Sequence, residues 1–235
     1  RLSRGGDRHA NAALHTIAHE CAHVEITHKL DMAFPDFLLR TRHADARIGY
    51  RWQIILACWD EYAATMLSAG LGTEPTEGYE DTFLKSLRDT KRQANEHIKA
   101  YRLHGSIDQV LGQVYVEYGE MLKFSAYHLG NLRGLDRQLP ELPRSVEALE
   151  GHWFAPYLAR LDAALRDISK AYGKWTDKDS FEIVGDIADD LLALSGIHFK
   201  SRPDGRLYID IPFKAETMPS EAEAAAFSAS RSSLK

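Results

Sequence analysis

Apolar residues recur every three or four positions through most of this 235-residue chain, and this spacing is typical of amphipathic α-helices. We expect helices over residues 11–29, 44–69, 76–103, 107–129, 145–172 and 180–194. Residues 197–211 differ, because two β-prone runs flank a Pro-Asp-Gly turn and so predict a β-hairpin. The expected fold class is therefore mainly α, with a small C-terminal β-hairpin.

The chain shows no internal repeat and no linker rich in Pro or Ser, so we expect a single domain over residues 1–214. Residues 215–235 are rich in Ala, Ser and Glu and contain few bulky apolar side chains. Such a segment buries little apolar surface, so we expect a disordered tail in which the Ala run could form a transient helix.

Charge and cysteine content exclude several classes of partner. With 29 Lys and Arg against 34 Asp and Glu, the net charge of −5 gives no general attraction to nucleic acids or to anionic lipids. The longest apolar run, residues 54–59, is too short to cross a bilayer, so we expect no membrane partner. Two cysteines, Cys21 and Cys58, are too few for a disulfide scaffold and favour a cytoplasmic location. These features do not indicate an oligomeric state.

Residues 19–23 read His-Glu-Cys-Ala-His and match the pattern HExxH. On a helix His19 and His23 are ~40° apart, so both imidazoles reach the same side and can bind one Zn(II). Glu20 follows His19 by ~100° and is suited to act as a general base that activates the metal-bound water. We expect the opposite side of this helix to be a buried apolar back. Its residues are Leu14, Ile17, Ala18, Cys21 and Val24.

A catalytic zinc requires a third protein ligand and an open position for water. Glu61 is the candidate, because it shares one face of the helix over residues 44–69 with small and apolar residues. A buried unpaired carboxylate is costly, so Glu61 requires a cation. That cation is either the metal or an arginine, for which Arg47 and Arg51 are available. Asp60, ~100° away from Glu61, is the alternative ligand.

This combination resembles the gluzincin type of zinc metallopeptidase, in which the third ligand is a Glu on a later helix. The matching residues are the HExxH element and residues 59–64, Trp-Asp-Glu-Tyr-Ala-Ala, and the likeness covers residues 11–69. Glu61 follows His23 by 38 residues, a separation that the group tolerates. The resemblance implies a zincin-like domain that hydrolyses peptide bonds in a peptide or protein substrate. It also implies one Zn(II) per chain, bound by His19, His23 and Glu61.

Two other HExxH families fit less well. Metzincins have a Gly three residues and a His six residues after the second His, and neither follows His23. Peptide deformylases use a Cys in a Gly-Cys-Leu-Ser-like strand, and the chain has no such strand. Cys58 could approach the site from one turn before Glu61, although a buried apolar role is more typical of both cysteines.

Gluzincins usually set the metal helix beneath a β-sheet whose edge strand holds the substrate, and only about ten residues precede this helix. The chain opens with Arg1, so the sheet could belong to a removed N-terminal segment, with residues 197–211 contributing to it. Alternatively, helices alone build the cleft.

Several other side chains are candidates for the surroundings of the metal. His15, one turn before His19, and Tyr50 are candidates for the cleft, and Thr65, one turn after Glu61, could orient a ligand. A residue that stabilises the oxyanion is usually a Tyr, His or Arg, and Tyr50, Tyr127 and His128 qualify by type.

The leading functional hypothesis is zinc-dependent hydrolysis of a peptide bond, with the metal-bound water activated by Glu20. The alternative is a binding or regulatory module in which the same zinc staples two helices without catalysis. A helical interaction domain without a metal is the third hypothesis. Glu20 favours the enzyme, because a structural zinc site has no use for a base at that position.

Overall fold

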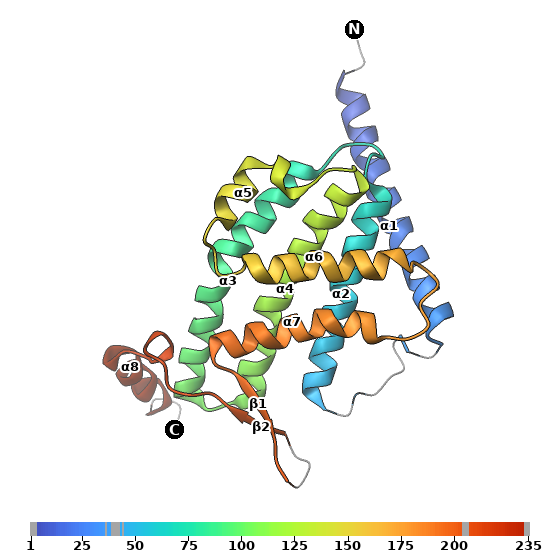
Figure 1. Cartoon of the computed structure of the whole chain (residues 1–235). Coiled ribbons are helices and arrows are strands. Elements are labelled where there is room, and N and C mark those ends of the chain that lie inside the picture. The colour runs from blue at the N-terminus through green and yellow to red at the C-terminus, as the bar shows by residue number, and fades with distance from the viewer. Residues whose placement is uncertain (1–3, 36, 39–42, 44, 204–206, 233–235) are drawn as a thin grey trace.

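The structure is a computed structural model that describes residues 4–35, 37–38, 43, 45–203 and 207–232. Over these residues the protein is mainly α, with a small antiparallel hairpin, and this confirms the expected fold class (Figure 1). The α-helices are α1 (Arg4–Ala33), α2 (Ala46–Ser68), α3 (Thr76–His104), α4 (Ile107–Gly134), α5 (Pro143–Leu149), α6 (Ala155–Lys170), α7 (Asp179–Ser195) and α8 (Glu221–Ser232). The remaining elements are strands β1 (His198–Ser201) and β2 (Leu207–Asp210), and the short 3-10 helices η1 (Leu139–Glu141) and η2 (Ala215–Thr217).

Helix α2 lies among its neighbours, packed against α1, α4 and α7, while α4 also packs against α3. Helices α6 and α7 run across the long helices α2 and α4 (Figure 1). Ile55, Trp59 and Tyr62 of α2 are fully buried, so residues on this helix have a rigid setting. No helix among the described residues is long and apolar enough to cross a membrane.

Two glycines of α4 allow it to approach α2 closely. A Cβ atom added at Gly130 would lie 2.2 Å from the carbonyl oxygen of Tyr62 and 2.3 Å from the hydroxyl of Thr65. A Cβ atom added at Gly134 would lie 2.3 Å from the carbonyl oxygen of Met66. The two glycines are one helical turn apart, so they form a contact strip on which the backbone of α2 rests. This strip fixes the distance between α2 and α4 near Glu61.

Local signals explain most helix ends. Helix α2 begins after Asp45, whose carboxylate accepts a hydrogen bond of 2.9 Å from the amide of Ile48. The helix expected over residues 145–172 is instead two helices, α5 and α6. Gly151 between them takes a φ of 66°, which favours glycine, and Pro156 starts the first turn of α6.

The hairpin pairs His198 with Asp210 and Ser201 with Leu207, as expected for antiparallel strands around a tight turn. Part of the predicted turn, residues 204–205, lies outside the described residues.

The C-terminal segment differs from the expected disordered tail, since residues 221–232 form α8. Ser220 and Glu223 cap the start of α8 reciprocally. The Glu223 carboxylate accepts hydrogen bonds of 2.6 Å from the Ser220 amide and 2.7 Å from its hydroxyl, and the Glu223 amide donates to that hydroxyl. This Ser-x-x-Glu pattern is a helix-start signal in the sequence, and it outweighs the scarcity of apolar residues. Residues 233–235 lie outside the described part of the chain.

Candidate metal centre

His19 and His23 of α1 lie one helical turn apart and reach toward Glu61 of α2. The Nε2 atoms of the two histidines are 3.1 Å apart, and Oε2 of Glu61 lies 3.5 Å from that of His19 and 3.6 Å from that of His23. Two ligand atoms that are each ~2.0 Å from a tetrahedral ion are ~3.3 Å apart. The three separations bracket this value, so the three side chains fit one zinc-sized ion.

Two polar atoms of this cluster lack hydrogen-bond partners. Oε2 of Glu61 and Nδ1 of His19 are buried and form no hydrogen bond with the described residues. A buried acceptor without a donor is costly, and a cation between the three side chains removes that cost for Glu61. The side chains of His19, Glu61 and His23 remain 13%, 17% and 23% exposed. The cluster is therefore partly open to solvent, which leaves room for a fourth ligand.

Asp60 supports one of the histidines rather than joining the three-atom cluster. Its Oδ2 atom lies 2.9 Å from Nδ1 of His23, on the side of the imidazole ring away from Glu61. We therefore assign the proton of neutral His23 to Nδ1, which leaves the lone pair of Nε2 directed at the cluster. A carboxylate behind a ligating histidine is a common arrangement in metal sites.

The charges around the cluster favour an ionised Glu61 and a protonated His23, so a metal ion that binds here displaces a proton from His23. Burial by itself raises the pKa of Glu61, but His19, His23 and the Tyr127 hydroxyl outweigh it, so the pKa lies below its usual value. Burial also disfavours protonated His23, but Asp60, Glu61 and Glu20 outweigh it and raise its pKa above 6.5. Glu61 is therefore ionised at neutral pH. The cluster attracts positive charge, which either a proton or a metal ion can supply.

Glu20 lies beside the cluster without belonging to it. Its side chain is exposed on α1, and its charge helps to raise the pKa of His23. The position is that of a group near the cluster, outside the three candidate ligands.

Tyr127 of α4 is an aromatic side chain in contact with the cluster. Its ring stacks on that of His19, with the centroids 6.1 Å apart and the planes 15° from parallel. Burial, and next the Glu61 carboxylate, raise the pKa of Tyr127 above its usual value, so the phenol keeps its proton. The sequence identified Tyr127 only by residue type, because the contact depends on the position of α4 against α1.

His15 lies on α1 one turn before His19, and Tyr79 of α3 lies beside it. Nδ1 of His15 donates a hydrogen bond of 3.2 Å to the carbonyl oxygen of Leu71, and its Nε2 is 3.5 Å from the hydroxyl of Tyr79. The ring of Tyr79 lies 5.4 Å from that of Tyr127. His15 is therefore attached to the loop after α2, and Tyr79 is a neighbour that no sequence signal indicated.

The structure places Tyr50 away from the cluster but in a groove between α2 and α4, and it gives the hydroxyl of Thr65 other partners than the Glu61 carboxylate. Tyr50 is 11 residues, about three helical turns, from Glu61 on α2, and it stacks on Tyr115 at 4.9 Å. The hydroxyl of Thr65 donates to the backbone oxygens of Glu61 at 2.7 Å and of Tyr62 at 3.1 Å. Thr65 therefore does not orient the carboxylate of Glu61, because the helix backbone already satisfies its hydroxyl.

The salt bridges considered for Glu61 are absent among the described residues, since Arg47 and Arg51 have other partners. Nη1 of Arg51 lies 2.6 Å and Nη2 of Arg47 lies 2.5 Å from Oδ2 of Asp189 on α7. Arg51 also pairs with Glu182 and Asp186. These contacts leave Glu61 without an arginine.

Neither cysteine belongs to the cluster. Cys58 is fully buried, and burial raises the pKa of its thiol. Cys21 is exposed on the side of α1 opposite the histidines. A buried neutral thiol at Cys58 agrees with an apolar packing role.

The apolar back of α1 is exposed, which corrects the expectation that it is buried. Leu14, Ile17 and Val24 are 48%, 60% and 71% exposed. The inward face of α1 instead carries the histidines, together with the buried residues Ala22, Ile26 and Leu30. The core lies on the histidine side because the packing of α1 on α2 set the orientation, which helical periodicity alone cannot do.

Helices form the surroundings of the metal cluster in the described part of the chain. The hairpin packs elsewhere. Phe199 of β1 lies 6.2 Å from the ring of Tyr115, under the guanidinium of Arg47, near the start of α2. The hairpin therefore does not form a sheet edge beside the cluster, where gluzincins have one.

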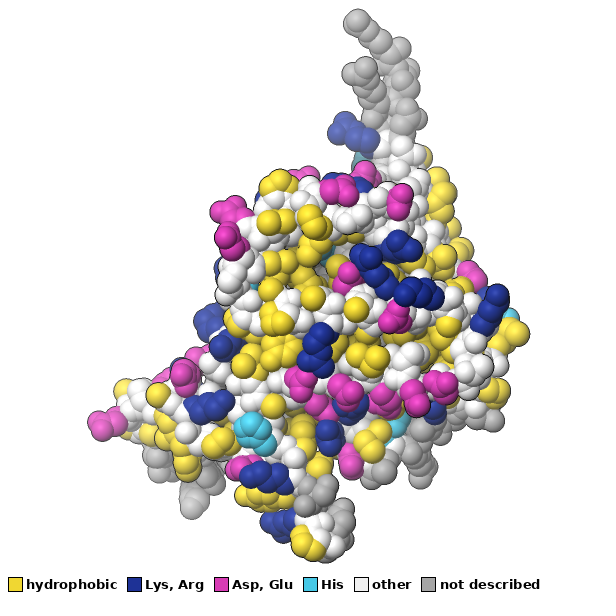
Figure 2. Space-filling view, viewed as in Figure 1, with side chains coloured by type: hydrophobic (Ala, Val, Ile, Leu, Met, Phe, Trp, Pro, Cys, Tyr) yellow, Lys and Arg dark blue, Asp and Glu magenta, His cyan; other side chains and the backbone are white. Residues whose placement is uncertain are grey.

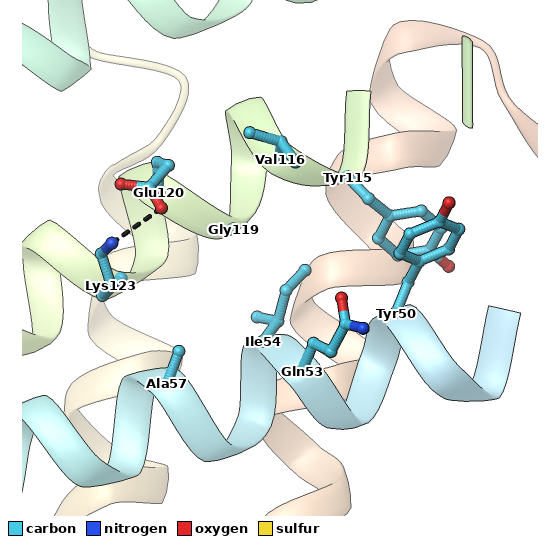
Figure 3. Close-up of a pocket in the computed structure, with 9 residues that line it drawn as sticks. All are labelled: Tyr50, Gln53, Ile54, Ala57, Tyr115, Val116, Gly119, Glu120 and Lys123. Carbon is cyan, nitrogen blue, oxygen red and sulfur yellow. Dashed lines mark hydrogen bonds and ion pairs between the residues drawn. The ribbon is translucent and has the colours of Figure 1, made fainter. Parts of the chain in front are cut away.

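A groove lies between α2 and α4 (Figure 3). Stacked Tyr50 and Tyr115 stand at one end, and the ion pair of Glu120 with Lys123, 2.7 Å long, stands at the other (Figure 3). Its floor includes Ile54, Ala57 and Gly119. Ala57 is one helical turn before Glu61, and Lys123 is one turn before Tyr127, so the groove runs along the same seam as the metal cluster.

His128, which qualified by type as an oxyanion stabiliser, is buried away from the cluster. Its ring stacks on Phe83 at 5.3 Å, and its Nε2 lies 3.3 Å from the hydroxyl of Ser145. Burial lowers the pKa of His128 from 6.5 to about 4, with Glu80 opposing and Arg137 adding to the shift. This histidine is a neutral core residue at pH 7.

Neutral His128 makes the stability of the protein depend on pH. Its pKa is lower in the folded chain than in the unfolded chain, so its contribution is complete above about pH 6.5 and is lost as the pH falls toward 4. Between pH 7 and pH 4 the unfolding free energy of the unchanged protein decreases. We expect this decrease to be about 3 kcal/mol smaller in His128→Phe, because phenylalanine does not titrate. Urea unfolding of both proteins at both pH values measures this. An equal loss in both proteins would contradict the prediction.

No family model, curated protein or solved structure matches this chain. The resemblance to gluzincins therefore rests on the motif residues and stays a prediction.

Proposed function

We propose that this protein is a zinc-dependent peptide hydrolase with His19, His23 and Glu61 as metal ligands. The observation that carries the proposal is the cluster of three ligand atoms from α1 and α2, separated by 3.1, 3.5 and 3.6 Å. The carboxylate of Asp60 behind His23 and the unpaired Oε2 of Glu61 support it further. Two His and one Glu with a position left open are the ligand set of catalytic rather than structural zinc sites.

In this proposal each residue around the cluster has a separate role in hydrolysis. When bound, Zn(II) polarises a carbonyl group and makes water a stronger acid. Glu20 accepts the proton of the attacking water and passes it to the leaving amine. Tyr127 keeps its phenolic proton and donates it in a hydrogen bond to the Glu61 carboxylate, so it helps to position that ligand. Asp60 holds His23 in the tautomer that presents Nε2 to the cluster.

The groove along α2 and α4 supports a peptide as the substrate. Its floor is apolar, and the ion pair of Glu120 with Lys123 lies where the groove approaches the cluster. An extended chain lying in this groove would place apolar side chains against Ile54 and Ala57 and its backbone near Glu61. We therefore expect substrates with apolar residues on one side of the cleaved bond.

Metal content tests the ligand assignment directly. We expect about one zinc per purified chain. His19→Ala, His23→Ala and Glu61→Ala should each lower zinc affinity by more than the ~10–100-fold that losing a supporting partner costs. Asp60→Ala should retain zinc with a loss of ~10–100-fold, because it removes only the hydrogen-bond partner of His23. Elemental analysis and competition with a chromogenic chelator measure both effects.

His97→Ala is the matched control, because His97 is paired with Glu117 at 3.0 Å on α3 and α4 and lies outside the cluster. It should bind zinc as the unchanged protein does. Stoichiometric zinc in a His19→Ala, His23→Ala double variant would overturn the ligand assignment. Zinc bound by all three ligands with no hydrolysis of any peptide would favour the zinc-stapled module instead.

A further inference from the structure

A second cavity lies between the end of α4, the segment that follows it, and α6. Its volume of about 430 Å³ falls within the range of ~300–1,000 Å³ that is usual for small-molecule sites. None of its lining residues belongs to the metal cluster or to the groove between α2 and α4. This α4–α6 cavity is therefore separate from the site of the proposed hydrolysis.

One part of the α4–α6 cavity is apolar. Leu129 and Leu132 of α4 and Leu158 of α6 line it, and these side chains are 6%, 2% and 3% exposed. Ala155 and Ala159, one helical turn apart on α6, line it as well, and their small side chains leave space. An apolar chain that binds here removes both its own surface and that of the leucines from water.

The other part of the cavity is charged. Along α6 the lining changes from Ala155 and Leu158 to Asp162 and Arg166, a distance of about 16 Å on the helix. Arg133 and its neighbours at the end of α4 add further positive charge to the lining. In Figure 2 Lys and Arg side chains gather over the second half of α6, beside hydrophobic side chains. The cavity thus has an apolar end and a cationic end.

The guanidinium groups at the cationic end differ in their partners. Nε of Arg166 lies 3.0 Å from a carboxylate oxygen of Asp162, and Nη1 of Arg137 lies 3.3 Å from one of Glu74. Arg133 forms no ion pair with any residue in the described part of the chain, and it is exposed. The lining therefore carries one positive charge that these residues do not balance, and this charge favours a ligand with a single negative charge.

Tyr62 of α2 lies behind the cationic end. Its side chain is fully buried, and its hydroxyl forms no hydrogen bond with the described residues. Burial, and next Asp162, raise the pKa of Tyr62 to about 12, while Arg133 and Arg166 oppose the shift. The phenol therefore keeps its proton, and all three charged side chains lie near it. A hydrogen-bond donor without a partner is thus present near the end of the cavity that attracts an anion.

We propose that the α4–α6 cavity binds a fatty carboxylate of medium chain length, with its carboxylate at Arg133 and its chain along Leu132 and Leu158. The guanidinium of an arginine can donate two parallel hydrogen bonds to a carboxylate. The apolar part of the lining matches the hydrocarbon chain, and the single unbalanced arginine matches one negative charge. The lining spans about 16 Å of α6, which is sufficient for an extended ten-carbon chain. The proposal does not depend on the metal cluster.

Isothermal titration calorimetry with decanoate, kept below its micelle concentration, tests this proposal. We expect one decanoate per chain. Butanoate has the same carboxylate and six fewer methylene groups, and each buried methylene contributes ~4-fold in affinity. With four of the six buried, decanoate should bind ~200-fold more tightly than butanoate. Decyltrimethylammonium has the same chain with a positive charge, so it should bind at least ~10-fold more weakly than decanoate.

Two outcomes of these titrations would overturn the proposal. A protein that binds no decanoate has no fatty carboxylate site. Equal affinities for decanoate and decyltrimethylammonium would mean that the apolar chain alone is bound and that the arginines select no anion.

An arginine variant tests the position of the carboxylate. Arg133→Gln should weaken decanoate binding ~10-fold, at the low end for a bond to a charged group, because water screens an exposed arginine. Arg160→Gln is the matched control, since Arg160 is an exposed arginine of α6 that pairs with Asp190 at 2.6 Å and does not line the cavity. It should bind decanoate as the unchanged protein does. Equal affinities for Arg133→Gln and Arg160→Gln would contradict the proposal.

A larger side chain tests the position of the hydrocarbon chain. Ala159→Trp should fill the apolar part of the cavity and abolish decanoate binding, whereas Ala163→Trp should retain it. Both alanines are exposed on α6, and only Ala159 lines the cavity, so circular dichroism should show folded protein in each case. Decanoate bound by Ala159→Trp with the affinity of the unchanged protein would place the ligand elsewhere and overturn the proposal.

Discussion

Replacing Glu20 with Gln is expected to slow peptide hydrolysis by ~10²–10⁴-fold while zinc content stays unchanged. The amide has nearly the shape of the carboxylate but cannot accept a proton. Glu20 is exposed beside His19 and is not one of the three clustered ligands, so its loss leaves the metal site intact. Steady-state rates on a peptide selected from a mixed library, together with elemental analysis, measure both quantities.

Glu25→Gln is the control for this experiment, since Glu25 is also an exposed glutamate of α1 but lies beyond His23. It should hydrolyse the peptide at the rate of the unchanged protein. Equal rates for Glu20→Gln and the unchanged protein would mean that Glu20 is not the base or that a contaminant cleaves the peptide. Loss of zinc from Glu20→Gln would instead assign Glu20 to the ligands.

Gly130→Ala is expected to lower the unfolding free energy by about 3 kcal/mol, at the upper end of overpacking effects. The new methyl group would lie 2.2 Å from the carbonyl oxygen of Tyr62 and 2.3 Å from the hydroxyl of Thr65. The first of these atoms belongs to the backbone of a buried helix, so α2 and α4 must separate. For a chain of this length the loss corresponds to a decrease of about 6–12 °C in melting temperature.

Gly78→Ala is the matched control, because Gly78 lies in the first turns of α3 and an added Cβ atom would meet no atom within 4 Å. It should leave stability unchanged or raise it by about 0.5–1 kcal/mol, since alanine loses less backbone entropy than glycine in a helix. Calorimetric scans of the three proteins give the comparison. Equal melting temperatures for Gly130→Ala and Gly78→Ala would contradict the close contact of α2 with α4.

The same glycine variant links stability to the candidate site. Tyr62 follows Glu61 directly, and Tyr127 precedes Gly130 by three residues. A separation of α2 from α4 therefore moves Glu61 away from Tyr127. We expect Gly130→Ala to weaken zinc binding as well, whereas Gly78→Ala should not.

The sequence by itself predicted the helices within residues 11–129 and 180–194, the hairpin and the pairing of His19 with His23, because these depend on spacing within one element. An i, i+4 pair on a helix has only one relative geometry, and the 3.1 Å between the two Nε2 atoms agrees with it. Glu61 could be identified as the carboxylate that needs a cation. Whether that cation was an arginine or a metal stayed open, because the partners of Arg47 and Arg51 lie more than 100 residues away on α7.

Only the tertiary structure decided which side of each helix faces the interior and which side chains of different helices meet. Helical periodicity predicted that the histidines and the apolar back lie on opposite sides of α1, but it could not predict which side packs on α2. Tyr127 takes its place beside the cluster because Gly130 and Gly134 bring α4 close to α2, whereas Asp60 meets His23 through the packing of α2 on α1. Contacts of this kind join residues distant in sequence, and their geometry depends on helix packing rather than on local spacing.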